Sequence, residues 1–291
     1  MRARLKVIGH ALATLLALAM TCGGAQAAEE IITLKTRPEV TLPYLLTQDQ
    51  GVSPRWVAVL FAGGAGAINL RRRDDGALVR SENFVIRTRA LFVKAGIATA
   101  AVDSPSDTQG MNDIFRQGEK HAADIALVVA DLRMRFPQAK IALIGTSRGT
   151  VSAAYNALAL GSTIDAVVLT SSVFNASRAG SGVSQLDFSK IQAPLLFVHH
   201  REDGCNVCPY NGAARWSERF PLISVSGGLP PQTGPCDPLS AHGYFGKEAE
   251  TVNAISLWIT GQPYAAEIKS GATQGSLRAG RCRARSFHRL L

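Results

Sequence analysis

The sequence has no apolar run long enough to cross a bilayer. Its clearest apolar run, residues 11–20, has ten residues, whereas a membrane-spanning helix needs about twenty. Three basic residues precede this run, and a small-x-small cleavage site follows it at residues 25–27. The pattern predicts a secretory signal peptide over residues 1–27, cut after Ala27. We therefore expect an exported protein, periplasmic or secreted, without a transmembrane segment.

Acidic residues are missing from both ends of the chain. Residues 1–27 carry three positive charges and residues 269–291 carry six, which together account for the whole formal net charge of +9. The body, residues 28–268, is therefore neutral, and it lacks the basic surplus that nucleic acids attract. The composition of residues 269–291 predicts a disordered basic tail. Weak contact of this tail with anionic surfaces is the alternative.

Cysteine is also scarce. The chain has five, and Cys22 leaves with the signal peptide; the residues before it do not resemble a lipobox. The four that remain are Cys205, Cys208, Cys236 and Cys282. An oxidising compartment permits disulfides, and four cysteines allow three complete pairings, among which spacing alone does not choose.

The body has no internal repeat, but it alternates short apolar runs with helical patterns. Such runs are typical of strands buried on both faces of a parallel sheet. Strands are expected at residues 31–35, 42–47, 56–62, 97–102, 140–144, 166–169, 194–199 and 221–225, and helices at 83–95, 121–136, 147–160 and 246–259. The alternation predicts an α/β fold with a doubly wound, mostly parallel sheet flanked by helices.

The segment between Ser171 and Pro194 is short. It has about twenty residues, little more than one crossover helix and its loops need. No room is left for a lid, so we expect a site that is covered only by loops.

The motif Gly-x-Ser-x-Gly occupies residues 145–149, between a predicted strand and a predicted helix. This context is that of a nucleophile elbow, where a serine on a strained turn projects from the edge of the sheet. The start of the following helix favours developing negative charge. The motif therefore predicts Ser147 as a nucleophile, and a capping serine in a glycine-bearing turn is the alternative.

On this motif and the order of the elements, residues 56–259 resemble the α/β-hydrolase superfamily. The resemblance is to small lidless members, of the dienelactone-hydrolase-like and prolyl-oligopeptidase-like kinds, and it implies the absence of a cap domain. Unlike dienelactone hydrolases proper, this chain has serine rather than cysteine as the nucleophile.

The resemblance implies a triad in the chain order serine, acid, histidine. Asp203, in the loop after the strand at residues 194–199, matches the acid position, and Glu202 is its rival. His242 is the single histidine between that acid and the basic tail, so the resemblance implies that it is the base.

The resemblance also implies an oxyanion hole made of two backbone N–H groups. Arg148, the residue after the nucleophile, supplies one, and by the family pattern Gly64 supplies the other. The loop differs from many relatives in having Ala62 where they carry histidine. The Arg148 side chain either binds a substrate carboxylate or, as we favour, pairs with Asp103 or Asp107 and braces the elbow.

If the acid and the histidine of this triad touch, Cys205 and Cys236 are neighbours. We therefore predict a Cys205–Cys236 disulfide that fixes the acid loop against the histidine loop. Cys208 is the competing partner, and Cys282 stays free.

Metal binding is not predicted. The spacing Cys205-x-x-Cys208 also occurs in redox pairs and half zinc sites, but no second cysteine pair has a matching spacing. The adjacent histidines His199 and His200 lie on one strand and should point to opposite faces, which argues against a shared metal with Asp203.

Together these features predict an exported serine hydrolase that cleaves carboxylic esters through an acyl-enzyme, with no cofactor. Without a lid, its substrate is either a small molecule or an ester exposed on a larger one. A peptidase or amidase with the same triad is an alternative, as is a non-catalytic binding protein that keeps the fold.

Overall fold

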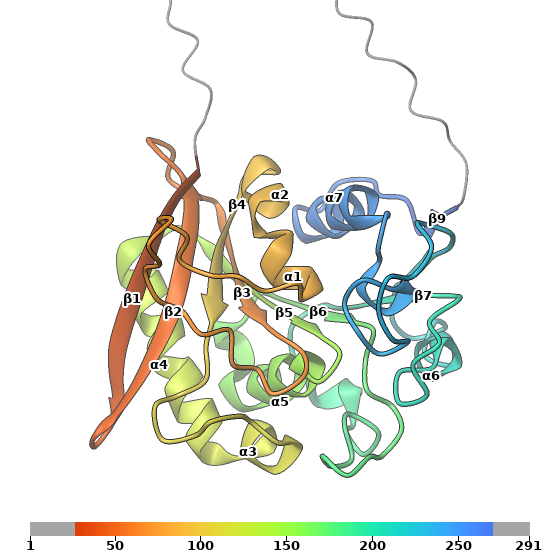
Figure 1. Ribbon diagram of the computed structural model, residues 1–291, viewed down its shortest axis with the longest axis horizontal. Helices are drawn as coiled ribbons and strands as arrows, with labels where there is room; N and C mark the ends of the chain where they lie inside the picture. The colour runs from red at the N-terminus through yellow and green to blue at the C-terminus, as the bar shows by residue number, and fades with distance from the viewer. Residues whose placement is uncertain (1–26, 270–291) are drawn as a thin grey trace, which may run out of the picture.

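The computed structural model describes residues 27–269, which form one sheet with helices on both of its faces (Figure 1). The predicted signal peptide and basic tail lie outside these residues, apart from Ala27 and Lys269 at their borders. Cys22 and Cys282 lie outside them too.

The sheet has nine strands in the order β1-β2-β4-β3-β5-β6-β7-β8-β9. All neighbours pair in parallel except β1 with β2 and β2 with β4. The bounds are β1 (Ala27–Arg37), β2 (Val40–Asp49), β3 (Trp56–Phe61), β4 (Ile97–Val102), β5 (Lys140–Thr146), β6 (Ala166–Thr170), β7 (Leu195–His200), β8 (Leu222–Val225) and β9 (Glu267–Ile268). This topology confirms the predicted doubly wound, mostly parallel sheet.

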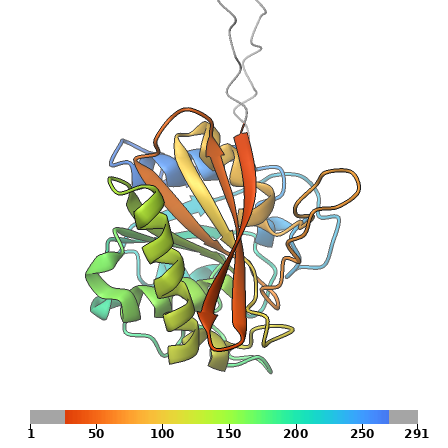
Figure 2. The same cartoon turned by 90° about the vertical axis from the view of Figure 1, so that its left-hand side faces the viewer.

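The strands β1 and β2 form the antiparallel edge of the sheet. Figure 2 shows this hairpin, in red, as a strongly twisted ribbon in front of the other strands. Most of β1 is exposed or half-buried, whereas β4, β6 and β7 are buried along their whole length. This difference is expected because an edge strand has one solvated side, while crossover helices cover both faces of a parallel sheet.

Helices cover the two faces of the sheet and create two cores. On one face lie α1 (Phe84–Arg87), α2 (Arg89–Lys94) and α7 (Glu248–Ile259). On the other lie α4 (Glu119–Arg135) and α5 (Gly149–Leu160). In α4, Ile125, Val128 and Leu132 recur at helical spacing and are fully buried, as expected for the face of an amphipathic helix that packs on the sheet.

The helix expected at residues 83–95 is in fact two short helices. The break falls at Thr88, whose buried hydroxyl donates to the carbonyl oxygen of Phe84 at 2.7 Å. A threonine that bonds back to the preceding turn competes with the regular helix, which accounts for the interruption. The short elements α3 (Asp113–Gln117), α6 (Tyr210–Ala214) and β9 were not predicted, because they are too short to show a periodic pattern.

No α-helix connects β6 to β7, although the segment is long enough for one. The segment contains only an isolated bridge and the 3₁₀ turn η2 (Phe188–Lys190). Its serines bond to nearby backbone, as when the Ser184 hydroxyl donates to the carbonyl oxygen of Ser181 at 2.7 Å. Local bonds of this kind favour turns over helix. The segment is therefore a loop, and it carries no lid domain.

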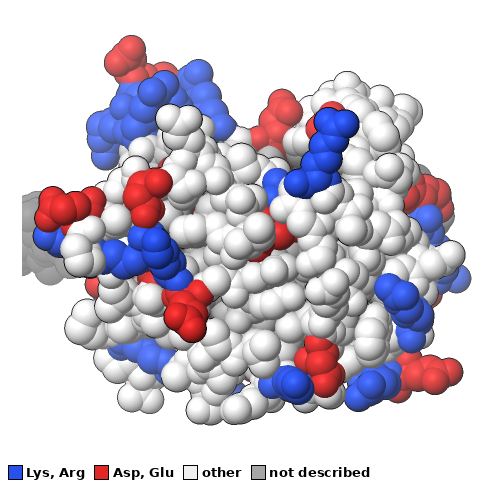
Figure 3. All heavy atoms as spheres, turned by 90° about the horizontal axis from the view of Figure 1, so that it is seen from below, with Lys and Arg blue, Asp and Glu red and all other residues white. Residues whose placement is uncertain are grey.

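Charged side chains lie mainly near the periphery of the face in Figure 3, with Lys and Arg beside Asp and Glu. The ion pairs within residues 27–269 include Arg37 with Asp107 and Arg201 with Glu267. None of the helices within residues 27–269 combines the length and the apolar character needed to cross a membrane.

Candidate active site

Ser147 lies on a tight turn between β5 and α5, with φ at +54°. This left-handed backbone conformation is uncommon for a residue with a side chain. The turn is held on both sides: the Ser147 N–H donates to the carbonyl oxygen of Thr170, and its carbonyl oxygen accepts from the Thr150 N–H, both at 2.9 Å. The structure therefore stabilises a strained serine at the carboxyl end of a central strand.

The two glycines of the motif are required by close packing. A Cβ at Gly145 would lie 2.2 Å from the carbonyl oxygen of Gly149, and a Cβ at Gly149 would lie 2.1 Å from that of Phe61. Contacts this short leave no room for a methyl group. The glycines thus let α5 begin directly behind Ser147, with its N-terminal end near the hydroxyl.

Asp203 and His242 are in direct contact. The ring Nδ1 of His242 lies 2.9 Å from Oδ2 of Asp203, and the two side chains are 2% and 0% exposed. The other carboxylate oxygen of Asp203 accepts from the Cys205 N–H at 2.9 Å. The carboxylate is thus fixed on both sides, and it directs the histidine ring.

The rival acid, Glu202, faces elsewhere. Its side chain is 58% exposed and lies 3.1 Å from the ring Nδ1 of His200. It also accepts from the Gly227 N–H at 3.1 Å. Of the two candidate acids, only Asp203 contacts His242.

The loop that carries His242 is anchored by residues that the sequence did not single out. Ser171, just after β6, donates to the carbonyl oxygen of His242 at 2.8 Å. The Tyr244 hydroxyl donates to the carbonyl oxygen of Val198 in β7 at 2.6 Å, and its oxygen lies 3.0 Å from that of Ser171. Proximity to His242 in the sequence was the available signal for Tyr244, whereas none pointed to Ser171.

Ser147 and His242 line the same pocket, whose volume is about 350 Å³. The ring Nε2 of His242 is buried and has no hydrogen-bond partner among residues 27–269. Gly63 and Gly64, from the loop after β3, line the pocket as well. The pocket therefore brings together a strained serine, the free nitrogen of an acid-bound histidine and a glycine-rich loop.

Two backbone N–H groups beside this pocket are free. Neither the Gly64 N–H nor the Arg148 N–H donates a hydrogen bond within the part of the chain that the structure describes. Gly64 has φ at +58°, and a Cβ built on it would meet no atom within 4 Å. Free N–H groups at a loop and at a helix start are suited to bind an anionic oxygen.

The Arg148 side chain pairs with Asp113, which corrects the expected partners. Its Nη2 lies 3.0 Å from Oδ1 of Asp113, a residue of the unpredicted helix α3. Asp103 instead accepts from the N–H groups of Ile68 and Leu70, and Asp107 pairs with Arg37. The arginine does brace the elbow, but the partner comes from a short helix whose position the sequence did not reveal.

The structure joins Cys205 and Cys236 in a disulfide, and Cys208 is buried and has no disulfide partner within residues 27–269. The sulfurs of Cys205 and Cys208 and a ring nitrogen of His242 lie within 4.8 Å of one another. Burial and the charge of Asp203 raise the pKa of the Cys208 thiol well above its usual range, and a hydrogen bond with Ser147 opposes them only in part. The thiol therefore stays protonated and is not a rival nucleophile.

The two histidines of β7 contact different neighbours. The Nε2 of His199 accepts from the Ser172 N–H at 2.9 Å, and that of His200 lies 2.8 Å from the carbonyl oxygen of Gly227. Burial, with the nearby His242, lowers the pKa of His199 to about 3, so its ring is neutral. As expected for adjacent strand residues, the rings do not converge on one point.

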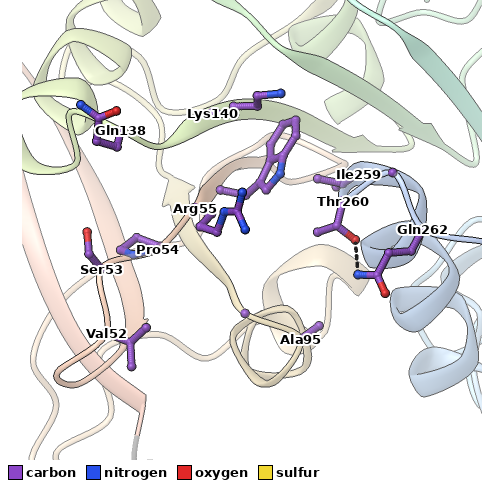
Figure 4. Close-up of a pocket in the computed structure, with 13 residues that line it drawn as sticks. Val52, Ser53, Pro54, Arg55, Ala95, Gln138, Lys140, Ile259, Thr260 and Gln262 are labelled. Carbon is purple, nitrogen blue, oxygen red and sulfur yellow. Dashed lines mark hydrogen bonds between the residues drawn. The ribbon is translucent and has the colours of Figure 1, made fainter.

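A larger cavity, of about 610 Å³, lies at the opposite edge of the sheet, near the start of β3 (Figure 4). Its lining includes Arg55, Trp56, Lys140 and Gln262, and it contains none of the predicted site residues. Cavity volume therefore does not identify the site in this protein. The candidate site is the smaller pocket, because of the groups that line it.

No protein-family model matches the chain, and no curated protein matches it in sequence. Among solved structures, it is similar to Est1E from Butyrivibrio proteoclasticus, with a TM-score of 0.54, 14% identity, and coverage of 80% of this chain and 98% of that one. For a dienelactone hydrolase from Anabaena variabilis these values are 0.52, 16%, 81% and 96%. For an α/β serine hydrolase without a lid from Xanthomonas campestris they are 0.50, 13%, 80% and 92%.

At these identities the likeness concerns the fold. The chain has the α/β-hydrolase fold without a cap domain, which confirms the predicted fold class. A shared fold does not by itself assign an activity, so the function must be argued from the site.

Proposed function

We propose that this chain is a serine hydrolase that cleaves carboxylic esters through an acyl-enzyme on Ser147. The observation that carries the proposal is the contact between Asp203 and His242 at 2.9 Å, with the Nε2 of His242 unpartnered beside a pocket that Ser147 also lines. This is the arrangement that a nucleophile, a base and an orienting acid require.

In the first half of the reaction, the Ser147 hydroxyl attacks the carbonyl carbon of the ester, and Nε2 of His242 takes its proton. Asp203 holds the proton on Nδ1 and stabilises the imidazolium that forms. The tetrahedral intermediate then collapses, the alcohol leaves with the proton from His242, and the acyl group stays on Ser147. In the second half, His242 takes a proton from a water molecule, which attacks the acyl-enzyme. The carboxylic acid is then released, and Ser147 regains its proton from His242.

The negative oxygen of the tetrahedral intermediate needs hydrogen-bond donors. We assign this role to the N–H groups of Arg148, which follows Ser147, and of Gly64, which lines the pocket; neither N–H donates a hydrogen bond within residues 27–269. The start of α5 adds favourable electrostatic potential at the same place. The ion pair of Arg148 with Asp113 supports this assignment because it fixes the elbow that presents the first donor.

Esters are favoured over amides on two grounds. The site lacks a cap domain and has only a small pocket, so it provides few surfaces to grip an extended peptide. Two structural relatives are a dienelactone hydrolase, which is named for a cyclic ester, and an Est1E with bound ferulic acid, a carboxylic acid. The substrate class is accordingly a small ester or an ester group exposed on a larger molecule.

Export is part of the proposal. The predicted signal peptide over residues 1–27 and the Cys205–Cys236 disulfide both suit an oxidising compartment, either periplasmic or extracellular. We further propose that the basic residues 269–291 make weak contact with anionic surfaces. Deleting them should weaken salt-sensitive binding to anionic vesicles and leave ester cleavage unchanged.

The test uses the purified mature protein and its Ser147→Ala variant. Wild type should hydrolyse p-nitrophenyl acetate and react with a fluorophosphonate probe, and the variant should lose labelling and about 10⁵-fold or more in kcat. A variant that labels and turns over like wild type would exclude Ser147. A matched p-nitroanilide separates esterase from amidase activity, since an amidase cleaves both substrates.

A further inference from the structure

A buried arginine lies behind the loop that carries Gly64. Arg116, in α3, is 1% exposed and is the largest fully buried side chain among residues 27–269. No carboxylate pairs with it in this part of the chain, because the nearby Asp113 is bonded to Arg148 and to the Gly182 N–H. A buried, unpaired guanidinium is costly to desolvate and therefore calls for an explanation.

All hydrogen-bond partners of Arg116 are neutral oxygens. Its Nε donates to the carbonyl oxygen of Met111 at 3.2 Å, and its Nη1 donates to the Ser152 hydroxyl at 2.7 Å. Its Nη2 donates to the carbonyl oxygen of Gly64 at 3.2 Å and reaches that of Ala62 at 3.5 Å, the limit of a hydrogen bond. The Nη1 nitrogen thus binds helix α5, and the Nη2 nitrogen binds the loop after β3.

The charge of Arg116 is retained at neutral pH. Burial and the charge of Arg148 lower the pKa of Arg116 to about 9, and Asp113 opposes them. The guanidinium is thus a fixed positive charge in a water-poor region, where electrostatic interactions are stronger than in bulk water.

The loop has a marked asymmetry. Three successive carbonyl oxygens are hydrogen-bonded: that of Gly63 by the Gly66 N–H of the same loop at 3.0 Å, that of Gly64 by Arg116, and that of Ala65 by the Met111 N–H at 2.8 Å. In contrast, the N–H groups of Gly63, Gly64 and Ala65 donate to no group within residues 27–269. In a trans peptide, C=O and N–H point in opposite directions. Each of these peptides therefore turns its N–H away from the group that binds its oxygen, which leaves the N–H available to a ligand.

We propose that Arg116 is a positioning residue for the oxyanion hole: it clamps the peptides on either side of the Gly64 N–H and places a positive charge behind the developing oxyanion. The inference rests on the proposed function. Arg116 acts through the loop and does not touch the substrate. A purely structural arginine would stabilise the packing of α3 against α5 without affecting the transition state.

The test compares Arg116→Gln and Arg116→Lys with wild type. In Arg116→Gln the charge is lost, and kcat for p-nitrophenyl acetate should fall about 10²-fold with little change in KM. Arg116→Lys keeps the charge without the fork, so its kcat should lie between those of Arg116→Gln and wild type. The rate of fluorophosphonate labelling should follow the same order.

A transition-state analogue separates the proposed role from a structural one. An alkyl trifluoromethyl ketone forms a tetrahedral adduct with Ser147, so its affinity should fall by the same factor as kcat in each variant. The corresponding unfluorinated ketone, which binds without an adduct, should be unaffected.

Ser152→Ala is the matched control. It removes the oxygen that binds Nη1 of Arg116, within the same buried cluster, and leaves the contact with Gly64 in place. It should lower the melting temperature as the Arg116 variants do and keep kcat close to that of wild type.

The proposal is overturned if either Arg116 variant, folded by circular dichroism, keeps wild-type kcat and analogue affinity, or if Ser152→Ala loses as much activity as Arg116→Gln. If Arg116→Gln does not fold, Arg116→Lys decides by the same criterion. Failure of the proposed function looks different, because wild type itself would then neither hydrolyse the ester nor label.

Discussion

The two edges of the parallel sheet differ in the state of their polar groups. At the carboxyl edge, Ser147 and Ser171 have positive φ, and the Nε2 of His242 is buried without a partner among the described residues 27–269. At the amino edge, the larger cavity is lined by cations and an indole ring, with the Lys140 ammonium 5.4 Å from the ring centre of Trp56. One edge holds strained and unsatisfied groups, and the other holds satisfied or solvated ones.

The comparison shows that the candidate site is identified by its groups rather than by its volume. Strained backbone and orphaned polar atoms cost free energy, so they persist where the surrounding structure enforces them. The cavity of about 350 Å³ has these features, and the cavity of about 610 Å³ has none of the predicted triad.

After the loss expected for Ser147→Ala, the next largest effect is expected for Asp203. In Asp203→Asn the side chain keeps its shape but no longer holds the correct tautomer of His242, so kcat should fall about 10⁴-fold. Glu202→Gln is the matched control, since Glu202 contacts His200 and not His242, and its kcat should stay close to that of wild type. Steady-state kinetics with p-nitrophenyl acetate measures both. Equal losses in the two variants would show that the carboxylates act as one cluster.

A smaller effect is expected when the disulfide is removed. The Cys205→Ala/Cys236→Ala double variant should lose about 3–4 kcal/mol of unfolding free energy, because the disulfide spans 31 residues in the sequence. Its kcat should also fall, since the acid loop and the histidine loop are no longer joined. Urea unfolding with and without a reductant measures the loss of unfolding free energy. Reductant should bring wild type down to the double variant and leave the double variant unchanged; any other pattern would contradict the assigned role.

Acid should destabilise the protein through its buried histidines. Burial lowers the pKa of His121 and of His199 to about 3, below the ordinary value of 6.5. Between pH 3 and pH 6.5, the unfolded chain therefore binds more protons than the folded protein. Stability is therefore full above pH 6.5 and falls as the pH drops toward 3, by up to about 1.4 kcal/mol per pH unit for each histidine.

His121→Phe tests this linkage without touching the site. His121 packs against the rings of Phe61 and Phe115, and both of its ring nitrogens lack partners within residues 27–269. Urea unfolding at pH 7.5 and at pH 5 should show a smaller loss in this variant than in wild type. An unchanged pH dependence would place the acid sensitivity elsewhere.

The smallest effect is expected at the amino edge. Lys140→Gln removes the cation beside Trp56 and should cost about 0.5–1 kcal/mol, the range for an exposed cation–π contact. Its kcat should not change, because this cavity contains no triad residue. Thermal unfolding and ester hydrolysis report the two quantities. A clear loss of activity would show that the amino edge of the sheet also contributes to ester hydrolysis.

Local sequence determined most of the framework and part of the site. Apolar runs and helical periodicity were enough to predict eight of the nine strands and the long helix α4, since these patterns record which faces are buried. The Gly-x-Ser-x-Gly motif pointed to Ser147, because only glycines fit the close approach of α5 to β5 and β3. Chain order pointed to Asp203 and His242.

Only the tertiary structure decided which distant side chains meet. It pairs Arg148 with Asp113 rather than Asp103 or Asp107, because a helix too short to show periodicity brings that aspartate to the elbow. It also places the buried charge of Arg116 behind the glycine-rich loop. Neither contact leaves a local signal, since both depend on how loops from separate strands fold over one edge of the sheet. The elements follow from local pattern, and the environment of Ser147 follows from packing.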